Sequence, residues 1–153
     1  MDAKILTVST STAMGEREDR SGPALAALLA ARGFAVLENA VVADGIDEVS
    51  GAVVALATGF AGLVVTTGGT GFAPSDLTPE ATARVLERSA PGLAEAMRAA
   101  SPLGRLSRGA AGTLGACIVL NVPGSTAGAL ECLDAVVDVL PHALDLLSGG
   151  RPH

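Results

Sequence analysis

The sequence predicts an α/β domain in which helices cover a mostly parallel β-sheet that is extended by a strand hairpin. Over the first 67 residues, three apolar, strand-like runs alternate with two runs of helical spacing, and this alternation is typical of parallel sheets. Further along, a glycine-rich stretch leads into the apolar run ACIVLNV, which favours a hairpin. The chain contains no Trp and no Tyr, so its core is built from Ala, Val and Leu.

The first half of the chain divides into three expected strands and two expected helices. We expect strands at residues 4–10 (KILTVST), 34–42 and 62–67, and helices at residues 23–31 and Ile46–Ala57. Pro23 suits the first turn of a helix, and Gly33 is a stop signal after the first helix. The polar stretch before Pro23, TSTAMGEREDRSG, is expected to form a mobile loop.

The tripeptide Thr78-Pro79-Glu80 predicts the start of a third helix. A Thr hydroxyl can cap free amides, Pro suits the first helical position, and a Glu carboxylate is favourable near the positive end of a helix. The dipeptide Pro91-Gly92 is expected to end this helix, and a further helix should run to about Ala100.

The C-terminal third is expected to hold the hairpin, at residues 106–122, and a last helix. Leu130, Leu133, Val137 and Leu140 recur at spacings of three and four, which predicts one amphipathic helix. Pro141 is expected to end or kink it before residues 142–147 resume the helix. Because no repeat or linker interrupts the chain, residues 1–153 are expected to form a single domain.

Composition excludes several classes of protein. With 16 acidic and 10 basic residues, the net charge of -6 lacks the basic footprint of a nucleic-acid-binding protein. No apolar run reaches the roughly 18–20 residues of a membrane span, and the N-terminal run is too short for a signal peptide. The apolar neighbours of Cys117 and Cys132 favour buried, reduced thiols over a disulfide. We therefore expect a cytoplasmic protein without a membrane or nucleic-acid partner.

Polar and glycine-rich segments follow the expected strands. They are residues 9–12, Asp44-Gly45, the loop Thr67-Gly68-Gly69-Thr70-Gly71, and Pro123-Gly124-Ser125. Ligands bind at the carboxyl ends of strands in an open parallel sheet, and glycines let backbone amides approach a phosphate closely. The loop at 67–71 has neither the Gly-Lys-Ser/Thr of a P-loop nor the spacing of a dinucleotide fingerprint. A tight turn without a ligand is the alternative interpretation.

Asp76 follows this loop and directly precedes the expected helix start, where the turn itself has no need of an acid. It could be a solvated loop residue, as most Asp side chains are. It could also be a magnesium ligand, since Mg²⁺ is typically held by one or two carboxylates together with substrate phosphates. Asp44 lies at another strand end on the same expected rim, so two carboxylates could converge on one ion.

Four segments together carry a resemblance to a known family. TTGGTGFAPSDLTPEAT, PGLAEAMRAAS, LSRGAAG and LNVPGS, in this order and at these spacings, resemble the Mog/MoaB family of molybdenum-cofactor biosynthesis. The resemblance extends over residues 5–149 and implies a three-layer α/β/α domain that assembles as a homotrimer. Mog-type members of the family use ATP and Mg²⁺ to adenylylate the terminal phosphate of molybdopterin, which releases pyrophosphate. A separate molybdenum-insertion enzyme then uses the product.

The resemblance also implies roles for individual residues. Asp76 corresponds to the essential Asp of the family and Asp44 to its acid after the second strand, so both would be catalytic and would hold Mg²⁺. The substrate-binding residues would be Thr67, Gly68, Gly69, Thr70 and Gly71 around the nucleotide phosphates, Ser101 for molybdopterin, and Pro123, Gly124 and Ser125 beside the nucleotide.

Two positions depart from the pattern of the family. Ser75 stands where the family often has Arg, which would remove one phosphate contact, and Ala43 replaces a usual Pro, which leaves Asp44 less rigidly placed. Two basic side chains, Arg105 and Arg108, either meet an anionic pterin phosphate or are solvated. His142, beside a proline, suits packing or capping better than general-base catalysis.

The resemblance leaves two alternatives to a molybdopterin adenylyltransferase. The chain could be a MoaB-like paralogue that binds molybdopterin with weak or different transferase activity. It could also be a non-catalytic trimeric carrier that holds the pterin for partner enzymes. The presence of both Asp44 and Asp76 favours an enzyme, because a carrier has no need of two metal-positioning carboxylates.

Overall fold

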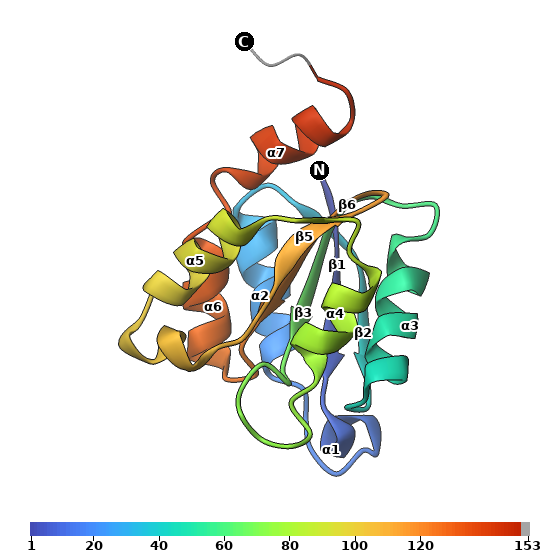
Figure 1. Cartoon of the computed structure of the whole chain (residues 1–153), viewed down its shortest axis with the longest axis vertical. Helices are drawn as coiled ribbons and strands as arrows, with labels where there is room; N and C mark the ends of the chain where they lie inside the picture. The colour runs from blue at the N-terminus through green and yellow to red at the C-terminus, as the bar shows by residue number, and fades with distance from the viewer. Residues whose placement is uncertain (151–153) are drawn as a thin grey trace.

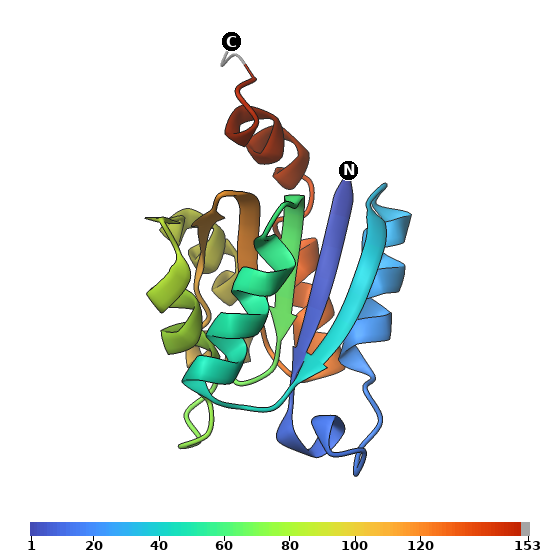
Figure 2. The same cartoon turned by 90° about the vertical axis from the view of Figure 1, so that its right-hand side faces the viewer.

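A six-stranded sheet with the strand order β2-β1-β3-β6-β5-β4 forms the centre of the computed structural model, which describes residues 1–150 (Figures 1 and 2). Four strands, β2, β1, β3 and β6, run parallel, and β5 pairs antiparallel with β6 and with β4. The strands are β1 Asp2–Val8, β2 Ala35–Val42, β3 Ala61–Thr67, β4 Arg88–Ser89, β5 Ala111–Leu114 and β6 Ala116–Val122. The predicted mostly parallel sheet with a hairpin is thus confirmed.

Helices cover both faces of the sheet and complete three layers. In Figure 1, α2, α5 and α6 lie to the left of the strands, and α3 and α4 lie to the right. Their bounds are α2 Ser21–Ala31, α3 Ile46–Ala57, α4 Thr78–Val85, α5 Pro91–Ala99 and α6 Thr126–Asp134, and the chain adds α1 Thr10–Ala13, a 3-10 helix η1 Pro102–Leu106, and α7 Leu140–Leu147. None of the helices within residues 1–150 is long and apolar enough to cross a membrane.

The apolar strand runs are explained by burial on both faces. In β3, Leu63 and Val65 belong to the core cluster under α2 and α6, whereas Val64 belongs to the cluster under α3. β1 divides in the same way, since Ile5 packs on one side and Leu6 on the other. A strand that is buried on both faces reads as a continuous apolar run, because successive side chains point in opposite directions.

The polar stretch after β1 contains more regular structure than expected. Residues Thr10–Ala13 form the single turn α1, and the Ser9 hydroxyl accepts a hydrogen bond of 3.3 Å from the Thr12 amide at its start. Helix α2 begins at Ser21, two residues before Pro23. The expected limits of α3 agree with the structure, and β2 and β3 differ from their expected limits by one residue.

The helix that starts at Thr78 is shorter than predicted and is capped differently. It ends at Val85 instead of continuing to Pro91, because Arg88 and Ser89 form the edge strand β4 against β5. The Thr78 hydroxyl makes no capping hydrogen bond, and Thr78 lies within the first turn instead of preceding it. Its oxygen is buried without a hydrogen-bond partner, while its amide donates to the carbonyl of Gly69 at 3.0 Å.

The predicted single C-terminal helix is divided into α6 and α7. Helix α6 ends at Asp134, a turn follows, and Pro141 lies in the first turn of α7, so Pro141 begins a helix instead of ending one. Leu133 and Leu140 are nevertheless buried, because the chain turns without leaving the core. Helix α7 extends beyond the end of the sheet that is opposite to the carboxyl ends of the parallel strands (Figure 1).

Asn121 of β6 forms a buried polar bridge between the sheet and α4. Its amide nitrogen donates to the hydroxyls of Thr66 at 2.8 Å and Thr82 at 2.9 Å, and its carbonyl oxygen accepts from the Ala110 amide at 3.0 Å. Only 2% of Asn121 is exposed. A buried polar group is favourable only when its partners are present, so the three bonds depend on one another.

We expect Asn121→Ala to lower the free energy of unfolding by about 3 kcal/mol, because it leaves two buried hydroxyls and one amide without their partner. Urea denaturation measures this change. The matched control is Asn39→Ala at an exposed position of β2, which should change stability by less than about 0.5 kcal/mol. Equal stability of the two variants would contradict a structural role for Asn121.

Candidate functional site

The carboxyl ends of β1, β3 and β6 meet at Gly68, directly after β3. A Cβ atom at Gly68 would lie 2.3 Å from the carbonyl oxygen of Val8, and one at Gly124 would lie 3.2 Å from the Gly68 Cα. Gly68 also has φ +106, a conformation that side chains disfavour. The two glycines therefore allow three strand ends to approach with only backbone between them.

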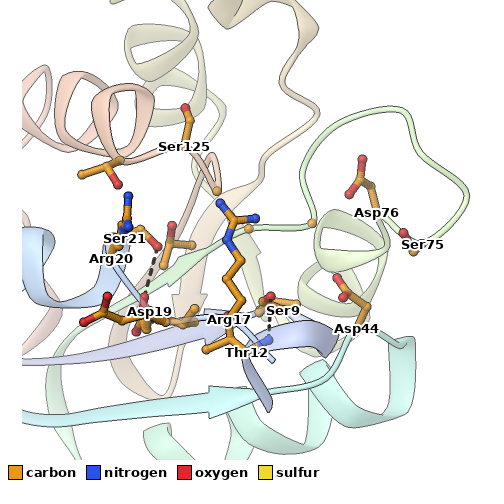
Figure 3. Close-up of a pocket in the computed structure, with 18 residues that line it drawn as sticks. Ser9, Thr12, Arg17, Asp19, Arg20, Ser21, Asp44, Ser75, Asp76 and Ser125 are labelled. Atoms are coloured by element: carbon orange, nitrogen blue, oxygen red, sulfur yellow. Dashed lines mark hydrogen bonds between the residues drawn. The ribbon is translucent and has the colours of Figure 1, made fainter. Parts of the chain in front are cut away.

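A first cavity of about 590 Å³ opens at this rim (Figure 3). Seven of its lining residues were predicted as site residues, namely Asp44, Thr67, Gly68, Gly69, Asp76, Gly124 and Ser125. Most of the remaining wall comes from the segment after β1, including Ser9, Thr12, Arg17, Asp19 and Ser21. The lining is rich in hydroxyls, charged groups and backbone amides, which suits a polar ligand.

A second cavity of about 760 Å³ lies beside the first and has a more apolar lining. It contains the other predicted residues, Thr70, Gly71, Ser101 and Pro123, together with Leu103 and Leu106 of the η1 segment. Four residues line both cavities: Gly69, Asp76, Gly124 and Ser125. The structure thus brings all eleven sequence-predicted residues together around two cavities that share one wall.

Asp44 is fixed by the first turn after β1. One carboxylate oxygen, Oδ2, accepts hydrogen bonds from the Thr10 amide at 2.9 Å and the Thr10 hydroxyl at 2.8 Å. The Asp44 amide donates back to the same hydroxyl at 3.1 Å. These bonds position the carboxylate although Ala43, and not a proline, precedes it.

Asp76 and Asp44 lie against the glycine loop from two sides. Asp76 Oδ2 accepts from the Ala73 amide at 2.8 Å, and it would lie 2.9 Å from a Cβ atom at Gly71. A Cβ atom at Gly69 would lie 3.4 Å from Asp44 Oδ1 and only 2.4 Å from the Thr78 hydroxyl. Larger residues at these two glycines would therefore collide with the groups that the loop holds in place.

The Asp44 and Asp76 carboxylates are of the ligand type that Mg²⁺ takes together with phosphates. Each keeps one oxygen, Oδ1, that takes part in none of the hydrogen bonds described above, and both side chains line the first cavity. Within residues 1–150 no three His, Cys, Asp or Glu side chains gather as a complete metal cage. Mg²⁺ needs no such cage, because it usually takes one or two carboxylates and completes its shell with phosphate and water.

Arg108 holds the loop that carries Asp76. Its amide donates to the carbonyl of Thr70 at 2.9 Å, its Nε to the carbonyl of Gly71 at 2.7 Å, and its guanidinium to the carbonyl of Asp76. The same guanidinium pairs with Glu80 of α4 and thereby lowers the pKa of that carboxyl. The Arg108 side chain is thus not a solvated surface cation, and it does not line the second cavity.

Sequence reasoning missed the segment 17–21, which forms one wall of the first cavity. Its fixed point is Asp19, whose carboxylate accepts from the Thr7 hydroxyl at 2.7 Å and from the Gly22 amide at 3.0 Å. Asp followed shortly by Ser-Gly at the start of a helix is a capping signal, so the sequence contained a cue that this segment is ordered.

The two thiols are free and buried, as predicted, and this burial makes them unsuited to nucleophilic catalysis. Both cysteines are free and buried, and burial raises the pKa of both Cys117 and Cys132 above its ordinary value. A raised pKa means less thiolate at neutral pH, and the thiolate is the nucleophile. Cys132 lines the second cavity, where its Sγ donates to the Met97 carbonyl at 3.4 Å.

Comparisons with known proteins agree on one family. Residues 4–142 match the family described as a probable molybdopterin binding domain. A molybdopterin adenylyltransferase of Helicobacter pylori strain J99 is 37% identical over 95% of this chain and 86% of its own length. The chain also resembles the structure of a molybdopterin biosynthesis enzyme MoaB from Thermus thermophilus, with 44% identity, a TM-score of 0.90, and coverage of 99% and 98% of the two chains. A molybdopterin biosynthesis Mog protein from Mycobacterium ulcerans is similar at 42% identity, a TM-score of 0.88, and coverage of 97% of both chains.

We expect Arg108→Ala to loosen the loop at residues 69–77, because it removes the side-chain bonds to two loop carbonyls and to Glu80. Hydrogen exchange of the amides in this loop should accelerate by about tenfold or more, and stability should fall by about 1–3 kcal/mol. Arg105→Ala is the control, since its exposed side chain bonds only the nearby Pro102 carbonyl. Unchanged loop exchange in the Arg108 variant would refute the holding role.

Proposed function

This chain belongs to the family of probable molybdopterin-binding domains, and from that premise we propose that it is a molybdopterin adenylyltransferase. In the proposed reaction, ATP donates its AMP group to the terminal phosphate of molybdopterin, and pyrophosphate is released. The relatives support the reaction through the name of the Helicobacter pylori protein. Titles that read MoaB and Mog occur at similar identity, so identity alone does not separate the transferase from a paralogue.

The observation that carries the proposal is the shared wall between the two cavities. A group-transfer enzyme must hold two substrates with their reacting ends adjacent. The polar cavity suits a nucleotide triphosphate, and the more apolar cavity suits a pterin ring system. Gly69, Asp76, Gly124 and Ser125 line both, so a nucleotide α-phosphate and a pterin phosphate could meet there. A carrier of one ligand has no need of a second adjoining cavity.

The residues at this wall suit an in-line displacement between phosphates. An oxygen of the pterin phosphate attacks the α-phosphorus, the new P–O bond forms, and the bond from the α-phosphorus to the bridging oxygen breaks. The electron pair of that bond leaves with pyrophosphate. Backbone amides of the glycine loop would stabilise the equatorial oxygens, because fixed dipoles need no reorganisation during the reaction. No covalent intermediate on the protein is required.

Asp44 and Asp76 would hold the magnesium ion that accompanies ATP. When bound, this ion would neutralise phosphate charge and so reduce repulsion between two anionic substrates. Asp44 is held by Thr10 and Asp76 by the loop amide of Ala73, so both carboxylates are oriented before any ligand arrives. Such orientation lowers the entropy cost of assembling the reactive complex.

We place the proposed enzyme in the cytoplasm as a single domain of residues 1–153, with the product passed to a separate molybdenum-insertion enzyme. Association of the proposed homotrimer is supported by helix α7, which extends beyond the sheet (Figure 1). Val139, directly before this helix, is 49% exposed, and Leu146 within it is 39% exposed. Exposed apolar side chains on a projecting helix favour burial against another subunit.

Asp76→Asn should reduce pyrophosphate release in the presence of molybdopterin and Mg-ATP by at least about 100-fold, because it removes the charge that would hold the metal. Molybdopterin should still bind, since most of its expected cavity is unchanged. The control Asp47→Asn removes the same charge from an exposed position of α3 that lines neither cavity. Turnover of the Asp76 variant within a few-fold of the wild type would remove the metal-binding role.

Light scattering at micromolar concentration should give a mass of three chains. Association is expected because a monomer would leave the exposed apolar surface near α7 in water, and the number of three chains is the one that the family resemblance implies. A uniform monomer would contradict the proposed trimer. The transferase proposal would then be tested only by the pyrophosphate assay.

A further inference from the structure

Two arginines line the first cavity and have no assigned role in the site. Arg17 and Arg20 are exposed lining residues of this cavity, and neither lines the second. Within residues 1–150, neither side chain forms an ion pair or a hydrogen bond, whereas Lys4, Arg32, Arg84 and Arg108 are all paired. In Figure 3 the Arg17 side chain rises into the space between Ser125 and Asp76.

The backbone that carries these arginines is anchored. Asp19 lies between them in sequence, and its carboxylate joins β1, through the Thr7 hydroxyl, to the start of α2, through the Gly22 amide. Asp19 leaves no room for a larger residue at Gly22, where a Cβ atom would lie 2.4 Å from Asp19 Oδ2. Arg17 and Arg20 therefore extend from a fixed wall of the cavity, and long side chains on a fixed base lose less entropy on binding.

The charges around the cavity are distributed unevenly. The cavity has four acidic lining residues, Glu18, Asp19, Asp44 and Asp76, and only these two cations. Asp76 is part of the wall shared with the second cavity, and Asp44 lies beside the same glycine loop. The arginines instead belong to the segment after β1 and line the first cavity alone, where the Arg17 side chain points toward the space between Ser125 and Asp76 (Figure 3). An anionic group that reaches this segment would meet the only positive side chains of the cavity.

We propose that Arg17 and Arg20 bind the β- and γ-phosphates of ATP and retain the pyrophosphate leaving group. The inference rests on the proposed function, in which the α-phosphate lies at the shared wall. The other two phosphates then extend into the first cavity alone, where the arginines are. Cleavage of the bond to the α-phosphorus places negative charge on the β-phosphate, and a guanidinium fork donates two parallel hydrogen bonds to such oxygens.

The test compares three ligands on the same protein, namely Mg-ATP, Mg-pyrophosphate and AMP, by titration calorimetry. Arg17→Gln and Arg20→Gln should each weaken Mg-ATP and Mg-pyrophosphate by about tenfold or more, because each removes charged hydrogen bonds. AMP affinity should stay within about twofold, since AMP lacks both outer phosphates. Arg32→Gln is the matched control, because Arg32 pairs with Asp134 on the surface and lines neither cavity.

Further measurements separate this inference from a folding defect and from the proposed function. Thermal midpoints of the variants should match that of the Arg32 variant, and Arg17→Lys should recover part of the affinity lost by Arg17→Gln. Unchanged pyrophosphate affinity in both Gln variants, or an equal loss of AMP affinity, would overturn the inference. Because these titrations contain no molybdopterin, they stand apart from turnover. A wild-type protein that binds pyrophosphate through the arginines yet releases none with molybdopterin would overturn the transferase proposal.

Discussion

The contact of backbone with backbone at Gly68 is the constraint on which the site depends. Three strand ends converge there, and the carbonyl of Val8 occupies the space that any side chain at Gly68 would need. Gly124 approaches the same point from β6. This close approach brings the strand ends to the wall that the two cavities share. The Gly68 amide takes part in the contact itself, because it donates to the carbonyl of Val122 at 3.1 Å.

Around this contact, the chain uses fixed polar groups to compensate for its scarcity of cations. Arg108 holds the loop of Asp76 by donating hydrogen bonds to carbonyls of that loop. Thr10 holds Asp44 in the same way, and Asp19 holds the segment that carries Arg17. Each anchor is a side chain that bonds backbone or hydroxyl groups of another element. In the proposed function, these anchors would let a protein with a net charge of -6 bind phosphates through ordered amides and two cations.

Sequence patterns located most elements because burial on both faces of a sheet produces long apolar runs. They failed where an element depends on contacts with a distant part of the chain and not on its own residue types. The two residues of β4 have no strand signature of their own and are defined by their partner β5. The Thr78 hydroxyl matches a capping pattern in the sequence, yet Thr78 is the first residue of the helix. Its amide donates a hydrogen bond to the carbonyl of Gly69. Leu133 and Leu140 keep helical spacing although the chain turns between them.

The sequence by itself determined the α/β class, the parallel strands, the glycine loop and the pair Asp44 and Asp76, since these follow from local spacing and residue type. Only the tertiary structure decided that two cavities adjoin, that Arg108 supports the loop, and that Arg17 and Arg20 line the polar cavity. These features join residues that lie far apart in the chain, and no local pattern encodes the distance between them. The packing of helices against the strands decides which loops lie together at the carboxyl ends of the sheet, and so it decides the geometry of these features.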